Sequence, residues 1–213
     1  MRLSPSDTDA LLVIDVQNDF CPGGALAVDE AHDIVPIINR LQAHFANVVL
    51  TQDWHPERHT SFASQHAKKD PFDNVTVAYG DQTLWPDHCV QGTTGADFHP
   101  ELNRHQAQLV IRKGFRTAVD SYSAFFENDR TTPTGLTGYL RERGIDRVFL
   151  TGLATDVCVR FSALDARNQG FDTVLVVDAC RGLGDDSVND ALTAMKEAGV
   201  RVIEAFAITG LAA

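Results

Sequence analysis

The stretch that decides the fold is RVFLTGLATDVCVRFSALDARNQGFDTVLVV, residues 147–177. It opens on an apolar run at 147–151 and closes on another at 173–177, and both runs are typical of strands buried on two faces. Between them, residues 156–169 are typical of a helix, and Gly170 follows where a helix end favours a residue without a Cβ. A strand, a helix and a second strand of these lengths make a βαβ unit, so the stretch predicts a parallel sheet.

The same alternation continues outside this stretch. Further strands are predicted for the apolar runs at 10–15, 47–51, 108–112 and 200–204. Further helices are predicted at 33–46, 133–143 and 187–198. Glycines expected just past helix ends are Gly144, Gly170 and Gly199, and the pairs expected at helix starts are Thr132–Pro133 and Thr155–Asp156. The predicted fold class is therefore α/β, a three-layer α/β/α sandwich with a six-stranded, mostly parallel sheet.

Length and composition bound the domain organisation. The chain has 213 residues, of which 44% are hydrophobic, and shows no repeat or linker, so we expect one domain over 1–213. Residues 52–107 form an interval too long for an ordinary connection, and it carries both tryptophans and several histidines. We therefore expect a metal-binding and cap insertion at about 52–107.

The charge excludes two classes of partner. Eighteen basic against 29 acidic residues give a net charge of −11, which disfavours nucleic acid and anionic membranes. No apolar run approaches the roughly 20 residues that span a bilayer, and the N-terminus has no apolar signal core. Four cysteines are too sparse for a disulfide framework. We expect a cytoplasmic protein that takes a small-molecule ligand, with homo-oligomerisation left open.

Side chains with chemistry follow the predicted strands. Asp15 comes after the first strand, Asp53 and His55 after the second and Lys113 after the third, while Cys158 lies on the helix after the fourth. Ligands of open parallel sheets bind outside the carboxyl ends of the strands. We therefore expect these five residues to meet in one pocket.

Cys158 is the candidate nucleophile. With Thr155 as N-cap it is the third residue of a helix, where free amides and the helix dipole lower the pKa of a thiol. The alternative interpretation is that residues 157–159 are an apolar helix turn packed on the sheet. Lys113 favours catalysis, because a lysine directly after a buried run must reach solvent or pair with an acid, here Asp15.

Together Asp15, Lys113 and Cys158 can perform acyl transfer to sulfur. The carboxylate takes the thiol proton and later delivers it to a leaving amine, and the lysine charge holds carboxylate and thiolate together. Backbone amides between Gly152 and Cys158 can stabilise the oxyanion. The predicted reaction is hydrolysis of a small amide, although Asp15 can also serve only to cap the turn at 17–19.

Asp53 and His55 are candidate metal ligands, because residues two apart on an extended segment point the same way. His88 is the third candidate, and this set leaves coordination positions for water or substrate. His59 can point toward or away from the metal. For the other histidines we expect solvated or structural roles; these are His32, His44, His66, His99 and His105.

Six ordered segments between about residues 9 and 205 carry a family resemblance: DVQNDF (15–20), TQDWHP (51–56), LWPDHC (84–89), RKG (112–114), DSYSAF (120–125) and GLATDVC (152–158). They resemble nicotinamidase/pyrazinamidase, a metal-containing branch of the isochorismatase-like cysteine hydrolases. The resemblance implies an amidohydrolase that deamidates nicotinamide to nicotinate and ammonia in NAD salvage and accepts pyrazinamide. It also implies one divalent metal ion, with zinc ahead of iron or manganese.

By position, the resemblance implies that Asp15 is the proton acceptor, Lys113 the family's lysine and Cys158 the nucleophile that forms a thioester. It implies an oxyanion hole made by the amides of Ala154, which follows a cis Leu153–Ala154 bond, and Cys158.

The resemblance also implies metal ligands that hold the ring nitrogen of the substrate, namely Asp53, His55 and His88. The implied walls of the ring pocket are Phe20, Trp85 and Tyr122. One position departs from the pattern: Ser61 stands where some members have an additional histidine, and a serine there could reach the metal only through water.

Other functions are carried as alternatives. Another small-amide or ureido hydrolase of the superfamily generally lacks the Asp53, His55 and His88 set, and an isochorismatase proper does not use Cys158. A non-catalytic metal-dependent binding protein on the same fold is disfavoured by the intact set of Asp15, Lys113 and Cys158. A dinucleotide-binding protein is excluded, because no GxGxxG follows the first strand.

Overall fold

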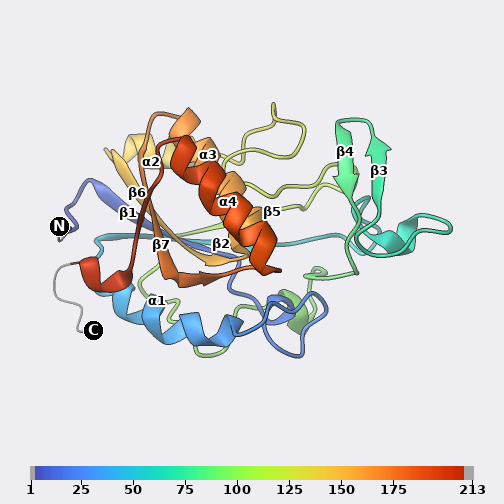
Figure 1. The fold of residues 1–213 in the computed structure, drawn as a ribbon, viewed down its shortest axis with the longest axis horizontal. Helices are drawn as coiled ribbons and strands as arrows, with labels where there is room; N and C mark the ends of the chain where they lie inside the picture. The colour runs from blue at the N-terminus through green and yellow to red at the C-terminus, as the bar shows by residue number, and fades with distance from the viewer. Residues whose placement is uncertain (1–2, 209–213) are drawn as a thin grey trace.

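Six strands form one sheet in the computed structural model, which describes residues 3–208 (Figure 1). They are β1 (Asp9–Ile14), β2 (Asn47–Asp53), β5 (Leu109–Lys113), β6 (Arg147–Leu153), β7 (Asp172–Arg181) and β8 (Arg201–Ile203). Their order is β5-β2-β1-β6-β7-β8, and every neighbouring pair is parallel. The six predicted runs are the six strands, and the α/β fold class is confirmed.

Strand β1 shows why these runs are apolar throughout. All six of its residues are buried. Leu11 and Val13 enter the apolar cluster on one face of the sheet, whereas Leu12 and Ile14 enter the cluster on the other face. Because alternate side chains point to opposite faces, a strand whose two faces are both covered favours apolar residues at successive positions, as at 10–14.

Helices cover both faces of the sheet (Figure 1). Helix α1 (Ile34–Gln42) packs on one face. The other face carries α2 (Leu136–Glu142), α3 (Arg160–Asn168) and α4 (Asp185–Glu197). Short 3-10 turns complete the helical elements, at Asn18–Phe20, Ala31–Asp33, Ala63–Gln65, Thr94–Ala96 and Ala205–Ala207.

The predicted start of helix α2 was wrong. The helix begins at Leu136 rather than Pro133, after Gly135 with a φ of 99°. The Thr132 hydroxyl donates to the Asp129 carboxylate at 2.6 Å, so it caps no helix. Three predicted helix ends are confirmed, because positive φ angles follow the helices at Gly144, Gly170 and Gly199. The helix predicted at 33–46 ends earlier than expected, at Gln42.

The helix predicted at 156–169 opens on a wide π turn, Thr155–Val159, and becomes α3 only afterwards. Thr155 is the first residue of this turn and Ala154 holds the N-cap position, so the predicted N-cap was wrong. The Asp156 carboxylate accepts instead from the Leu183 amide at 3.1 Å, across to the segment before α4. Cys158 is thus the fourth residue of a π turn and not the third residue of an α-helix.

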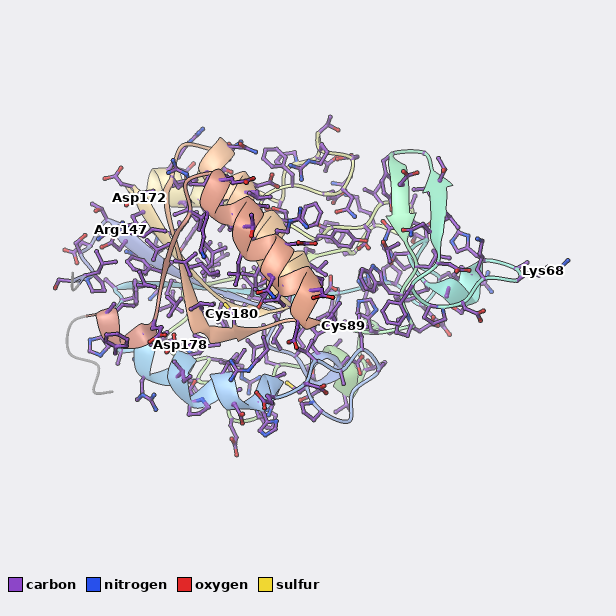
Figure 2. The ribbon with its side chains drawn as sticks, viewed as in Figure 1. Lys68, Cys89, Arg147, Asp172, Asp178 and Cys180 are labelled. Carbon is purple, nitrogen blue, oxygen red and sulfur yellow. The ribbon has the colours of Figure 1, made fainter. Side chains whose placement is uncertain are left out.

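The segment between β2 and β5, residues 54–108, is called the inserted segment below. It contains an antiparallel hairpin of β3 (Asn74–Val77) and β4 (Gly80–Thr83), which the sequence analysis did not predict. Lys68 of this segment lies at the opposite end of the molecule from Arg147 and Asp172, the first residues of β6 and β7 (Figure 2). The carboxyl ends of the strands therefore face the inserted segment. Within residues 3–208, no helix is long and apolar enough to cross a membrane.

Candidate active site

Lys113, the last residue of β5, lies at the centre of the candidate site. Its side chain is fully buried, and Nζ lies 2.8 Å from Asp15 Oδ2 and 3.2 Å from Asp53 Oδ1. The same ammonium lies 3.4 Å from Cys158 Sγ and donates to the Ser121 carbonyl at 2.9 Å. One charge thus contacts the predicted base, the predicted nucleophile and a predicted metal ligand, as their positions after neighbouring strands indicated.

Asp15 follows β1 in a left-handed conformation with a φ of 47°, which aspartate tolerates better than most residues. The Thr51 hydroxyl donates to its Oδ1 at 2.6 Å, and the Asp15 amide donates to the same hydroxyl oxygen at 3.1 Å. Burial raises the pKa of the carboxyl, and the charge of Lys113 only partly opposes this. Asp15 is therefore a stronger base than an ordinary aspartate.

The Cys158 thiol contradicts the expected thiolate. Burial raises its pKa well above the usual value, the charge of Lys113 opposes the shift, and the charge of Asp15 adds to it. The expectation of a lowered pKa failed because it counted the helix dipole and omitted desolvation and the carboxylate. The resting group is a thiol, so its use as a nucleophile requires a neighbouring proton acceptor, which Asp15 provides.

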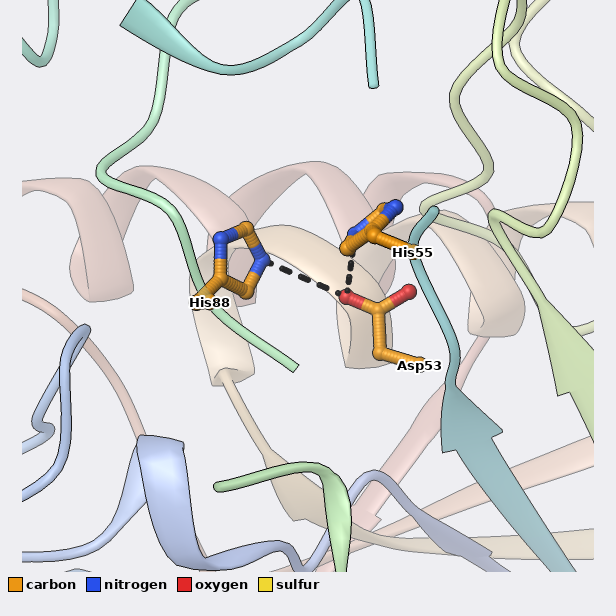
Figure 3. A group of neighbouring side chains, drawn as sticks. All are labelled: Asp53, His55 and His88. Atoms are coloured by element: carbon orange, nitrogen blue, oxygen red, sulfur yellow. Dashed lines mark hydrogen bonds and ion pairs between the residues drawn. The ribbon is translucent and has the colours of Figure 1, made fainter. Parts of the chain in front are cut away.

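Asp53, His55 and His88 point toward one another (Figure 3). Asp53 Oδ2 lies 3.0 Å from His55 Nε2 and 3.4 Å from His88 Nε2. Each imidazole places Nδ1 near a backbone carbonyl, that of Gly114 at 3.0 Å and that of Pro86 at 2.8 Å. If Nδ1 donates to these carbonyls, both Nε2 lone pairs face the carboxylate, which is the arrangement a metal-binding histidine needs. The three residues fit a divalent ion.

The electrostatics of this group keep Asp53 ionised. Burial raises the pKa of Asp53, but the charges of His55 and Lys113 outweigh it and hold the pKa well below its usual value. Burial likewise lowers the pKa of His55, and Asp53 outweighs it, so that the net shift is upward. Asp53 is thus an anion in a buried position, where one lysine and two imidazoles surround it.

A pocket opens onto both groups, because its lining includes Cys158 as well as Asp53, His55 and His88. Three aromatic residues line it, namely Phe20, Trp85 and Tyr122, as expected of the ring pocket. Cys158 and Ala154 form part of the wall, and the Leu153–Ala154 peptide bond is cis. The aromatic lining suits a small planar ring with a polar substituent.

The structure adds residues that the sequence analysis did not select. The pocket is also lined by Leu26, Asp120, Val157 and Leu183. Asp120 and His59 form a second group of metal-type donors with His55, and the His55 and His59 rings lie 4.3 Å apart. Ser61 Oγ is buried and lies 2.7 Å from His59 Nδ1. A signal for Asp120 was its place directly before the Ser-Tyr-Ser of a family-like segment.

The other three cysteines lie outside the lining of this pocket. All are buried and free, namely Cys21, Cys89 and Cys180. Burial raises the pKa of Cys21 to about 11 and that of Cys180 to about 12. A buried cysteine with a high pKa behaves as a small apolar side chain.

The Isochorismatase domain model matches residues 9–206. The chain belongs to the isochorismatase family. It is 51% identical over 204 residues to the nicotinamidase of Acinetobacter baylyi, covering 95% of each chain.

Three solved structures are similar to this one. An Acinetobacter baumanii nicotinamidase/pyrazinamidase superposes with a TM-score of 0.92 at 55% identity, covering 94% of this chain and 97% of that one. PnC1 from L. infantum in complex with nicotinate gives 0.88 at 38% identity and coverage of 98% and 99%. The pyrazinamidase of Pyrococcus horikoshii in complex with zinc gives 0.77 at 36% identity and coverage of 92% and 99%.

Proposed function

We propose that this protein is a nicotinamidase that hydrolyses nicotinamide to nicotinate and ammonia and also accepts pyrazinamide. The observation that carries the proposal is the single Lys113 ammonium in contact with Asp15, Asp53 and Cys158, the last two of which line a pocket with aromatic walls. Relatives named nicotinamidase that cover nearly the whole chain support the same substrate. The reaction belongs to NAD salvage.

In this mechanism Asp15 removes the proton from the Cys158 thiol as Sγ attacks the carboxamide carbon. Lys113 keeps the two anionic groups together, and the amides of Ala154 and Cys158 receive the oxyanion. Asp15 returns its proton to the leaving nitrogen, so that ammonia departs and a thioester remains. Asp15 then takes a proton from a water molecule whose oxygen attacks the thioester. It passes this proton to the Cys158 sulfur as nicotinic acid leaves and ionises to nicotinate, which restores the thiol and the Asp15 carboxylate.

Asp53, His55 and His88 would hold one divalent ion, and zinc is proposed because the Pyrococcus horikoshii pyrazinamidase is similar in structure and was solved with zinc. When bound, the ion would take the ring nitrogen of the substrate. Phe20, Trp85 and Tyr122 would then enclose the ring. The inserted segment contributes both histidines and Trp85, so we propose that it is the metal-binding and cap insertion of a single domain spanning 1–213.

The cellular setting is part of the proposal. Four free thiols fit a reducing compartment, which supports a cytoplasmic location. The net charge of −11 supports a small amide as the partner and opposes nucleic acid and anionic membranes.

Ammonia release from nicotinamide by metal-replete protein tests the function, and Cys158→Ala tests the mechanism. The substitution should reduce kcat at least about 10⁴-fold, because removal of a nucleophile leaves only binding and oxyanion stabilisation. Circular dichroism and metal content should not change. Cys180→Ala is the matched control, because this thiol is buried outside the pocket lining, and it should keep most of the activity. Turnover retained by Cys158→Ala would exclude the thioester route.

A panel of small amides separates this function from the alternatives. Nicotinamide and pyrazinamide should release ammonia faster than aliphatic amides and ureido compounds, because only the aromatic amides fill the pocket and offer a ring nitrogen. Faster release from a ureido compound would indicate the other hydrolases of the family. A metal-replete protein that releases ammonia from none of them would be a binding protein.

The metal assignment has its own test. His55→Ala should lose its bound metal, measured by mass spectrometry of the purified protein, because one of three ligands is removed. His105→Ala changes an exposed histidine of the same inserted segment and should keep the full metal content. Full metal content in His55→Ala would remove His55 from the ligand set.

A further inference from the structure

Gln82, on strand β4, is a buried polar residue that the proposed mechanism does not use. It is 1% exposed, although the two residues before it in the hairpin, Gly80 and Asp81, are exposed. Its amide lies within hydrogen-bond distance of five groups, which belong to Tyr79, Thr83, Asp120, Tyr122 and Asn128. A buried amide needs hydrogen-bond partners, but one that joins five groups in a network also fixes the positions of those groups.

The partners determine which way the amide points. Nε2 lies 2.6 Å from the Thr83 carbonyl and 3.2 Å from the Asp120 carboxylate, and both of these groups accept. Oε1 lies 3.3 Å from Asn128 Nδ2, which donates. The Asn128 amide is itself oriented, because its Oδ1 accepts from the Tyr122 backbone amide at 3.0 Å. The position therefore requires an amide, because a carboxylate would face Asp120 and a carbonyl with no hydrogen to donate.

Gln82 joins the hairpin to the aromatic wall of the pocket. Its Nε2 donates to the Tyr122 hydroxyl oxygen at 2.7 Å, and Trp85 Nε1 donates to the same oxygen at 3.1 Å. The Trp85 and Tyr122 rings meet edge-on, with centroids 6.0 Å apart and an interplanar angle of 81°. Gln82 does not line the pocket, but Trp85, Tyr122 and Asp120 do.

We propose that Gln82 is a positioning residue that selects for aromatic amides by holding the Trp85 and Tyr122 rings in place before the substrate arrives. Because the Trp85 and Tyr122 side chains are already ordered, they lose less conformational entropy when a flat ring binds. The substrate therefore binds more tightly, while the rate of the chemical step at Cys158 does not change. The inference rests on the proposed function, because the ring to be held is that of nicotinamide.

Steady-state kinetics of Gln82→Met tests this role, because methionine keeps the volume and removes the amide. KM for nicotinamide should rise about fivefold to tenfold while kcat stays within about twofold, as for a loss of binding shared by ground and transition states. Gln65→Met changes an exposed glutamine of the same inserted segment and should alter neither constant. An unchanged KM, or a fall in kcat at constant KM, would overturn the proposal.

A double-mutant cycle asks whether Gln82 acts through the Tyr122 hydroxyl. In a Tyr122→Phe background, Gln82→Met should change KM by less than about twofold, because the two substitutions remove the same contact. The same fold-change in both backgrounds would overturn the proposal. If Gln82→Met does not fold, Tyr79→Phe replaces it, since the Tyr79 hydroxyl donates to Gln82 Oε1 at 2.8 Å. It should raise KM in the same direction by a smaller factor.

A spectroscopic readout separates this inference from the proposed function. In a Trp54→Phe background Trp85 is the only tryptophan, and Gln82→Met should shift its emission to longer wavelength as the indole loses its ordered partner. Gln65→Met should not shift it. If the protein releases no ammonia from nicotinamide, the proposed function fails, whereas an unshifted emission in Gln82→Met overturns the positioning role whatever the substrate.

Discussion

The sheet and the inserted segment meet at the pocket, but different interactions dominate in the two places. In β1 every side chain is apolar after Asp9, and backbone pairs with backbone. At the boundary with the inserted segment, a buried side-chain amide makes the hydrogen bonds to the backbone that a neighbouring strand would make. Gln17 accepts from the Asp53 amide at 2.7 Å and donates to the Asp53 carbonyl at 2.8 Å and to the Ala96 carbonyl at 2.9 Å.

This difference explains why the sheet serves as a platform and the inserted segment positions the residues of the site. Apolar burial is strong but carries no direction, so it can build a platform from many interchangeable side chains. Hydrogen bonds from buried amides contribute less net free energy, but each one specifies a partner and a distance. The metal-type ligands and the aromatic wall need fixed positions, and they lie where such bonds predominate.

The largest effect should follow a change in the sheet at Gly152, which has a φ of 111°. A Cβ at this position would lie 2.1 Å from the Ile14 carbonyl oxygen on β1. Gly152→Ala should therefore cost at least about 4 kcal/mol of unfolding free energy, measured by urea denaturation. Gly138→Ala is the control: it lies inside α2 with nothing within 4 Å, and should gain about 1 kcal/mol from helix propensity. Equal stability of the two variants would contradict the rigid backbone contact.

A smaller and more local effect should follow Gln17→Leu. Leucine leaves the Asp53 amide and carbonyl without their side-chain partner, which should cost about 2 to 4 kcal/mol. Hydrogen exchange should become faster in the inserted segment while β6 and β7 keep their protection. Gln91→Leu removes a single bond, from an exposed glutamine to the Trp54 carbonyl, and should change exchange little. Uniform loss of protection in Gln17→Leu would show that the two regions unfold as one.

The sequence predicted the sheet well because its signal is local. A run such as residues 147–151 identifies itself as a strand without reference to any other segment, and residues after the strands converge by topology alone. The role of Gln17 depends on Asp53, 36 residues away, and that of Gln82 on Asp120, 38 residues away. Composition and periodicity contain no information about such pairs.

The pKa of Cys158 and the start of α2 failed for a related reason. Each expectation considered one favourable local interaction. For the pKa of Cys158 this was the helix dipole, and for the start of α2 it was a threonine before the helix. For Cys158 the omitted contributions come from the rest of the fold, namely burial and the Asp15 charge, whereas for Thr132 the competing partner is Asp129, only three residues earlier.

The junction of the two regions should be sensitive at Gly114, which follows β5 with a φ of 66°. A Cβ there would lie 2.5 Å from His55 Cε1 and 3.0 Å from Asp53 Oδ1. Gly114→Ala should displace the imidazole and weaken metal binding by about 10-fold to 100-fold, measured by competition with a chelator. Gly135→Ala is a matched control, since it also has a positive φ but no atom within 4 Å. Equal metal affinity in both variants would indicate that strain, and not contact with His55, is responsible.

The smallest effect should come from a change at Gln42, a buried amide in the otherwise apolar packing between α1 and the sheet. Gln42, the last residue of α1, is completely buried, and neither Nε2 nor Oε1 has a hydrogen-bond partner in the described residues. Gln42→Met keeps the volume and removes the unpaired amide, so it should stabilise the protein by about 1 kcal/mol in urea denaturation. Gln82→Met, in the inserted segment, should instead destabilise it, because that amide is fully paired. A loss of stability in Gln42→Met would mean that an ordered water satisfies the amide, and the contrast between the two glutamines would then vanish.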